Sequence, residues 1–333
     1  MKKYFRALLR SGTPQPQNSL NLAGQKIWFE QAEVLERGKA SKIVSLNEIP
    51  DAIIESLISL RSNFVFGDYR IPKIMGILNI TPDSFSDGGQ YYSPKFAVDN
   101  LKNIASLGAD ILDVGGESTR PGADFVCTQE ELKRVVPIIK ELFSHNFNHV
   151  ISVDTRKSEV MQTAMDLGVN FINDVSALSF DSKSLSVVAS QPTVISLMHG
   201  NNDPKTMQIN PQYDNVLLDV YDYLSQRKKE AIEAGISSQN IILDPGIGFG
   251  KTIEHNLALI RGISLFHSLG CPLLVGVSRK RFIGDLANEP QPKKRLPGSI
   301  TVALELLRQG VQIIRVHDIK ATRQALNLWN ALL

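Results

Sequence analysis

The sequence predicts an α/β protein built on a (β/α)8 TIM barrel with a small N-terminal extension. Eight short apolar runs each end in a polar or glycine-containing cluster and are each followed by a helical stretch. The runs are continuous rather than alternating, which suits parallel strands covered on both faces. The repeating part spans about 260 residues, close to the usual length of this barrel. An open doubly wound sheet is the alternative, but it usually has fewer strands.

Composition narrows the class of protein further. The chain has 333 residues, of which 43% are hydrophobic and 21% charged, so it can bury a sizeable core. The 36 Lys and Arg nearly balance the 34 Asp and Glu, which gives no electrostatic case for a nucleic-acid partner. No apolar run approaches the ~18 residues of a membrane span. Two cysteines are too few for a disulfide scaffold and indicate reduced thiols in a cytoplasmic protein.

Residues 1–70 are expected to form an extension of unassigned role. No acidic residue occurs between Met1 and Phe29, and such an acid-poor start is also typical of an organelle transit peptide. The favoured interpretation is a short cationic arm followed by a linker over Ser11–Ser19. The apolar spacing in Ser45–Leu60 predicts a short helix.

Residues 71–333 are expected to form the barrel. The predicted strands are Ile74–Ile80, Ala109–Val114, Val150–Val153, Phe171–Val175, Thr193–Met198, Ile241–Leu243, Pro272–Val277 and Val311–Val316. The predicted helices are Lys95–Leu107, Glu130–Phe143, Ser158–Leu167, Ser182–Ala189, Asn215–Ala234, His255–Ser264, Gly298–Arg308 and Ala321–Leu332.

Polar groups follow every predicted strand, and strand carboxyl ends carry the chemistry of such barrels. One set suits a planar heterocycle with several N–H donors: Asp154, Asn173 and Asp244. A second set suits an anion, because arginine recognises phosphate with a bidentate fork: Asn79, Arg120, Arg315 and His317. A single such residue is more often a turn or cap residue, but capping does not call for Lys280, Arg315 and His317.

Two other patterns carry little weight. The glycine-rich stretch Gly246–Thr252 fails the phosphate-loop spacing because Pro245 stands where that motif needs glycine. It fails the dinucleotide fingerprint at Lys251. The six histidines form no zinc-ligand array.

Eight segments together resemble the dihydropteroate synthase family, in order and over the whole of 73–333. They are KIMGILNITPDSFSDGG (73–89), DVGGESTRPGA (113–123), ISVDT (151–155), IND (172–174), LMH (197–199) with PKTMQ (204–208), LDPGIGFGK (243–251), GVSRKRFIG (276–284) and IRVHD (314–318). The resemblance does not extend to residues 1–70.

This resemblance implies a folate-pathway transferase that joins 6-hydroxymethyl-7,8-dihydropterin diphosphate to 4-aminobenzoate and releases diphosphate. By position, the pterin would be held by Asp154, Asn173, Asp244 and Lys280, with Met198 and Phe249 packed near it. The diphosphate would be served by Asn79, Thr119, Arg120, Arg315 and His317. The resemblance assigns direct parts in the reaction to Asp154, Lys280, Arg120, Arg315 and His317.

It further implies Mg2+ as cofactor with Asn79 at the metal, a homodimer, and membership of a family that sulfonamides target; the sequence does not give the affinity for sulfonamides. Residues 81–92 and 117–127 would be mobile loops that close over the site. One departure is Arg281, which stands where some members carry a serine near the aminobenzoate carboxylate.

Two rival functions remain at this stage. A methyltetrahydrofolate methyltransferase shares the barrel and the central acidic residues, but it has no role for Lys280 or for Arg315 and His317. A catalytically dead binding protein would be expected to lack Arg120, Lys280 or Arg315, and all three are present.

Overall fold

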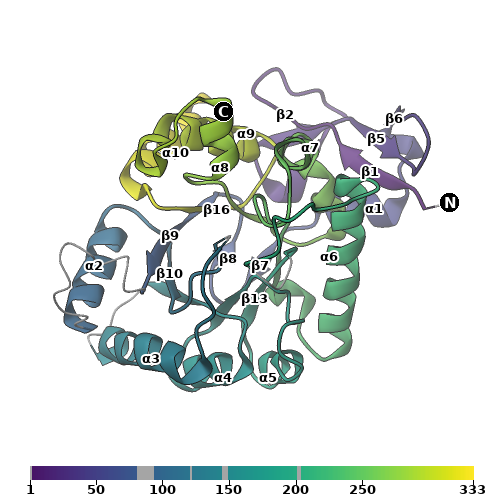
Figure 1. Cartoon of the computed structure of the whole chain (residues 1–333). Helices are drawn as coiled ribbons and strands as arrows, with labels where there is room; N and C mark the ends of the chain where they lie inside the picture. Colours follow the sequence, from purple (N-terminus) through teal and green to yellow (C-terminus); the bar gives the residue numbers. More distant parts are fainter. Residues whose placement is uncertain (1, 81–93, 121, 145–148, 201–203) are drawn as a thin grey trace.

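Eight parallel strands form the centre of the molecule in the computed structural model, which describes residues 2–80, 94–120, 122–144, 149–200 and 204–333 (Figure 1). Their order in the sheet is β14-β13-β12-β11-β10-β9-β16-β15. A parallel bridge between Leu243 and Leu273 joins the two outermost strands and closes the barrel. The strands are β9 (Lys73–Asn79), β10 (Ile111–Gly115), β11 (Val150–Asp154), β12 (Phe171–Asp174), β13 (Val194–Met198), β14 (Ile241–Asp244), β15 (Leu274–Gly276) and β16 (Ile313–Val316). The barrel prediction is confirmed.

Helices surround the strands and bury their apolar faces against them (Figure 1). They are α2 (Pro94–Ser106), α3 (Thr128–Ser144), α4 (Ser158–Asp166), α5 (Ser184–Ala189), α6 (Val216–Glu233), α7 (Ile253–Arg261), α8 (Arg281–Leu286), α9 (Leu296–Arg308) and α10 (Ile319–Leu332). Helix α8 was not predicted; at six residues it is too short for helical periodicity to reveal it.

The barrel interior is packed at the end where its strands begin. Met75, Ile111, Phe171, Val194, Ile242, Leu274 and Ile313 meet there with Tyr69, which is 2% exposed. Tyr69 follows the short hairpin of β7 (Ser62–Asn63) and β8 (Gly67–Asp68), so this hairpin brings an aromatic plug to the base of the barrel. The opposite end, where the strands finish, is left for polar side chains.

The prediction of a cationic arm at the N-terminus is wrong, because this segment forms a strand of a small sheet. β1 (Tyr4–Ala7) pairs antiparallel with β5 (Gln31–Leu35), which also pairs with β6 (Lys42–Ser45). A second small sheet joins β2 (Arg10–Ser11), β4 (Ile27–Phe29) and β3 (Leu20–Asn21). The predicted helix of Ser45–Leu60 is reduced to a 3-10 turn (Leu46–Glu48) and α1 (Asp51–Ile58), with Pro50 between them.

The extension packs against the outside of the barrel beside α6 and α7 (Figure 1). The Tyr4 ring meets Tyr221 of α6 edge-on at 5.3 Å, and the Tyr4 hydroxyl donates to Asp222 at 2.8 Å. Arg61 is buried and donates to both the ring and the carbonyl of His267, each at 2.9 Å. The 3-10 segment Ile263–Leu269 is buried throughout, and β1 and α1 both contact it.

Candidate active site

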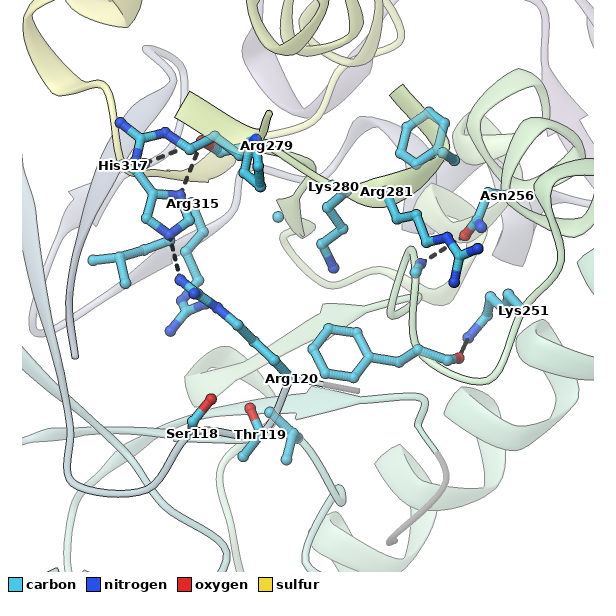
Figure 2. A pocket seen from close by; sticks show the side chains of 18 of the residues that line it. Ser118, Thr119, Arg120, Lys251, Asn256, Arg279, Lys280, Arg281, Arg315 and His317 are labelled. Carbon is cyan, nitrogen blue, oxygen red and sulfur yellow. Dashed lines mark hydrogen bonds between the residues drawn. The ribbon is translucent and has the colours of Figure 1, made fainter. Parts of the chain in front are cut away.

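A cavity of about 1000 Å3 opens where the barrel strands end (Figure 2). All the site residues predicted from the sequence line it: Asn79, Thr119, Arg120, Asp154, Asn173, Met198, Asp244, Phe249, Lys280, Arg315 and His317. Strand register explains part of this convergence. Gly115 pairs with Asn79 on one side and with Asp154 on the other, and Asp154 pairs with Asn173, so these residues form one row across β9 to β12.

Arg315 joins two carboxylates in the barrel interior. Its Nε donates to Asp113 Oδ2 at 2.6 Å, and its Nη2 donates to Asp154 Oδ2 at 2.7 Å. Asn173 Nδ2 also donates to Asp113 Oδ2, at 3.3 Å. Burial raises the pKa of Asp154, while the Arg315 guanidinium opposes that shift. Among the described residues, Asp113 Oδ1 and Asp154 Oδ1 accept no hydrogen bond. Asp154 lines the cavity, so its Oδ1 remains an acceptor for a donor on a ligand, whereas Asp113 is fully buried and is not part of the lining.

Asp113 was not among the predicted site residues, although the sequence contains a signal for it. An aspartate inside the apolar strand ILDVG is unusual, because a buried carboxylate needs a partner. Its partner Arg315 lies 202 residues away in the chain, which no local pattern reveals.

A sharp turn after β14 positions Asp244. Asp244 Oδ1 accepts from the Gly246 N–H at 2.7 Å. Gly246 has φ +67°, and a Cβ there would lie 1.9 Å from the His199 carbonyl oxygen, so only glycine fits. Burial raises the pKa of Asp244 to about 6.

Lys280 and Phe249 form the neighbouring wall. The ammonium of Lys280 lies 4.2 Å from the centroid of the Phe249 ring and donates to the Ile247 carbonyl. Burial lowers the pKa of Lys280 to about 7, although Asp244 opposes the shift. Lys280 follows Arg279, which has φ +60° and is held by hydrogen bonds to Ser299 and Asp318.

Lys251 lines the cavity as well and is 4% exposed, although it was not among the predicted site residues. Its ammonium donates to the Phe249 carbonyl at 2.8 Å and contacts His199 Nδ1 at 3.0 Å. It therefore holds the turn that carries Phe249. Burial lowers the pKa of Lys251 to about 7.

Arg120 and His317 face each other at the cavity (Figure 2). Arg120 Nη2 lies 2.9 Å from His317 Nε2, and His317 Nδ1 lies 3.1 Å from Ser278 Oγ. Burial, followed by the charge of Arg120, lowers the pKa of His317 to about 3. The imidazole is therefore neutral at physiological pH, with Nε2 accepting from Arg120 and Nδ1–H donating to Ser278.

Three further predictions concern Arg281 and the two expected loops. Arg281 lies at the start of α8 with its side chain 91% exposed, and its nearest acidic partner is Asp285 at 3.6 Å. The expected loop 81–92 lies outside the described residues. The expected loop 117–127 is described except for residue 121, and Gly122 N–H donates to the Pro204 carbonyl at 2.9 Å.

Within the described ranges, no group of three or more His, Cys, Asp or Glu side chains is arranged to hold a metal ion. In the same part of the chain, no helix has both the length and the apolarity needed to cross a membrane.

Comparison with known proteins identifies the class of protein to which this barrel belongs. Residues 75–317 match the family described as pterin binding enzyme, which agrees with a barrel whose cavity offers buried acceptors at its base. Dihydropteroate synthase of Neisseria meningitidis serogroup B is 49% identical to this chain over 267 residues, covering 78% of this chain and 93% of that protein. The synthase of Escherichia coli K12 is 45% identical, covering 80% and 93%.

Solved structures agree. Dihydropteroate synthase of Xanthomonas albilineans with 4-aminobenzoic acid has a TM-score of 0.75 at 42% identity, covering 80% of this chain and 94% of that one. The same enzyme in complex with 7,8-dihydropteroate has a TM-score of 0.72 at 39% identity, covering 79% and 94%. The chain belongs to the dihydropteroate synthase family.

Proposed function

We propose that this chain condenses 6-hydroxymethyl-7,8-dihydropterin diphosphate with 4-aminobenzoate to give 7,8-dihydropteroate and diphosphate. The observation that carries the proposal is one cavity with buried carboxylates at its base and Arg120, Lys280 and His317 around it. Solved relatives bind 4-aminobenzoate and 7,8-dihydropteroate, the amine substrate and the product of this reaction.

The pterin ring occupies the base of the cavity. Asp154 and Asp244 are acceptors for the N–H donors of its aminopyrimidinone edge, and Asn173 offers both a donor and an acceptor. Asp154 Oδ1, which has no hydrogen-bond partner among the described residues, supports this placement, because a buried acceptor without a partner is costly until a ligand supplies one. Met198 and Phe249 line the same cavity and contribute apolar contact to the ring.

The diphosphate lies toward Thr119, Arg120 and His317. A neutral His317 leaves the Arg120 guanidinium fully charged, and its remaining N–H groups can bind phosphate oxygens. Asn79 offers one amide oxygen at the cavity, which fits Mg2+ that arrives on the substrate, since this ion commonly keeps waters and phosphate oxygens among its ligands. Bound there, Mg2+ would neutralise charge on the leaving group.

The reaction begins when the bond between the methylene carbon and the diphosphate oxygen breaks, with both electrons leaving on oxygen. The carboxylates at the base stabilise the electron-deficient pterin methylene group electrostatically. The arylamine nitrogen then forms the new C–N bond and loses its proton to the departing diphosphate or to water. An aryl amine needs no strong base in this sequence of steps, so departure of the diphosphate is the demanding step.

Three further expectations belong to this proposal. The chain acts as a homodimer in the cytoplasm, as the family resemblance implies, and light scattering of the purified protein would measure the mass. Sulfonamides compete with 4-aminobenzoate, since a related synthase of Yersinia pestis has been solved in complex with a sulfonamide drug. The competition would be read from the apparent KM for 4-aminobenzoate.

The test is product formation. The purified chain is incubated with the pterin diphosphate, 4-aminobenzoate and Mg2+, and dihydropteroate is identified by mass spectrometry. We expect dihydropteroate and diphosphate in equal amounts, and loss of both without Mg2+. No product from a folded protein, or methyl transfer from methyltetrahydrofolate in its place, would refute the proposal.

A further inference from the structure

A buried ionic cluster stands behind the loop that carries Thr119 and Arg120. Glu117, at the start of that loop, has a side chain only 3% exposed. Its carboxylate accepts from Arg156 through both oxygens at 3.2 Å and from Lys157 Nζ at 2.8 Å. These two cations follow β11, the strand that ends at Asp154, so the cluster joins the loop to a rigid element of the barrel.

The same carboxylate also closes the loop on itself. Glu117 Oε1 accepts from the Val126 N–H at 3.0 Å, which ties the two ends of a ten-residue segment together. Phe125 adds a second attachment, because its ring lies 5.1 Å from the Lys157 ammonium. Although burial opposes ionisation, Arg156 and Lys157 lower the pKa of Glu117, so the group is a carboxylate at physiological pH.

We propose that Glu117 is a positioning residue that fixes the 118–126 loop and thereby sets where the Arg120 guanidinium meets the leaving diphosphate. Glu117 does not touch the cavity; it acts through Arg120, which is three residues along the chain and contacts His317. The inference rests on the role proposed above for Arg120.

The physical reason is the sensitivity of charge stabilisation to geometry. A guanidinium on a loop loses much of its effect if the loop samples many positions, whereas a preorganised cation costs no reorganisation when the bond breaks. Glu117 supplies that preorganisation with one side chain, since it holds both loop ends and two buried cations at once. A displacement of about 1 Å in such a group can reduce the rate by 10²-fold.

Glu131 provides a matched control. It is fully buried on α3, and its Oε2 accepts from the same Lys157 ammonium at 2.5 Å. It belongs to the cluster but is no part of the loop. Glu131→Gln therefore removes one negative charge from the cluster without releasing the loop ends.

The experiment compares three single variants: Glu117→Gln, Glu131→Gln and Arg120→Ala. A double variant combines Glu117→Gln with Arg120→Ala. Thermal unfolding confirms that each variant is folded. We expect Glu117→Gln to lower kcat by about 10- to 100-fold. It should raise the inhibition constant of free diphosphate and leave the dissociation constant of 6-hydroxymethylpterin unchanged. Glu131→Gln should lower the unfolding temperature but keep kcat within about twofold, as expected for sites that do not share the loop.

The double variant tests whether Glu117 acts through Arg120. If Glu117 acts through Arg120, adding Glu117→Gln to Arg120→Ala should cause little further loss, because the group being positioned is gone. Glu117→Asp is the second variant: it keeps the charge but is one methylene shorter, and it should lose kcat as well.

The experiment distinguishes failure of the proposed function from failure of the positioning inference. Full activity of Arg120→Ala would remove Arg120 from the proposed function. An impaired Arg120→Ala beside a fully active Glu117→Gln would overturn the positioning inference alone. So would an equal loss from Glu117→Gln in both backgrounds, or an equal loss of kcat in Glu131→Gln, because either would mean that the cluster only stabilises the fold.

Discussion

Arg315 illustrates how one side chain can serve both the fold and the reaction. It neutralises Asp113 and Asp154, which are both buried, and it lines the cavity at the same time. Removing one partner of a buried ion pair is far more costly than removing a surface charge, because the remaining charge stays uncompensated. Any test of Arg315 in catalysis therefore has to measure stability as well.

We predict that Arg315→Ala lowers turnover by about 10²-fold or more, the scale seen when one stabilising group is lost. We also expect it to cost about 3–5 kcal/mol of unfolding free energy, because two buried carboxylates lose their counter-charge. The contact with Asp113 is one source of this cost in stability. Steady-state kinetics and denaturant unfolding would measure both effects. Wild-type turnover in the folded variant would remove Arg315 from the mechanism.

The pH dependence follows from Asp244 and Lys280. Burial raises the pKa of Asp244 to about 6, so its carboxylate is lost as the pH falls through that value. Burial lowers the pKa of Lys280 to about 7, so its charge is lost as the pH rises through that value. Both groups are charged only between these limits. We predict a bell-shaped profile of kcat/KM for the pterin diphosphate, whose two apparent pKa values belong to the interacting pair.

Lys280→Met tests whether Lys280 is the group that produces the alkaline limb of that profile. Because methionine does not titrate, the alkaline limb should disappear from the variant while overall activity falls. An unchanged alkaline limb in Lys280→Met would assign that limb to the substrate or to Lys251, whose pKa burial also lowers to about 7, and would return Lys280 to a structural role.

At the scale of elements, the extension braces one side of the barrel. None of its described residues, 2–70, lines the cavity, and the 3-10 segment Ile263–Leu269 packs against it. The hairpin at 62–68 differs from the rest of the extension, since it leads into Tyr69 at the base of the barrel.

We therefore predict different outcomes for two truncations. A chain that begins at Ser59 should unfold at a lower temperature but keep kcat close to that of the full chain, because the site is intact. A chain that begins at Arg70 also loses Tyr69 and should accumulate poorly. Thermal unfolding and kinetics per folded molecule would distinguish them. A folded 59–333 chain without activity would mean that the extension completes the site.

The elements that could be predicted are those encoded locally. Strands and helices alternate along the barrel sequence, so apolar runs and helical periodicity located all eight strands to within a few residues. β1 could not be found in this way, because its four residues are stabilised by β5, which starts 24 residues after β1 ends, and by Tyr221 on α6. Likewise, strand ends predicted which polar residues share the cavity, whereas the pairing of Arg315 with Asp113 depends on closure of the barrel.

At the scale of the whole molecule, the cavity places charges of opposite sign along the path of the reaction. Carboxylates at the base of the cavity suit a pterin methylene cation, and Arg120 suits the departing diphosphate. This arrangement predicts that the carbon–oxygen bond can break before the amine attacks. A concerted displacement would gain little from the buried carboxylates.

The most direct test places 18O in the oxygen that joins the methylene carbon to the diphosphate. The labelled substrate is incubated with the enzyme and Mg2+ without the amine, recovered, and examined for the position of the label. If the bond breaks reversibly, rotation of the bound diphosphate moves label into the non-bridging oxygens of the same phosphate, and Arg315→Ala should slow this movement. Label that stays wholly in the bridging position, in enzyme that turns over once 4-aminobenzoate is added, would contradict the account.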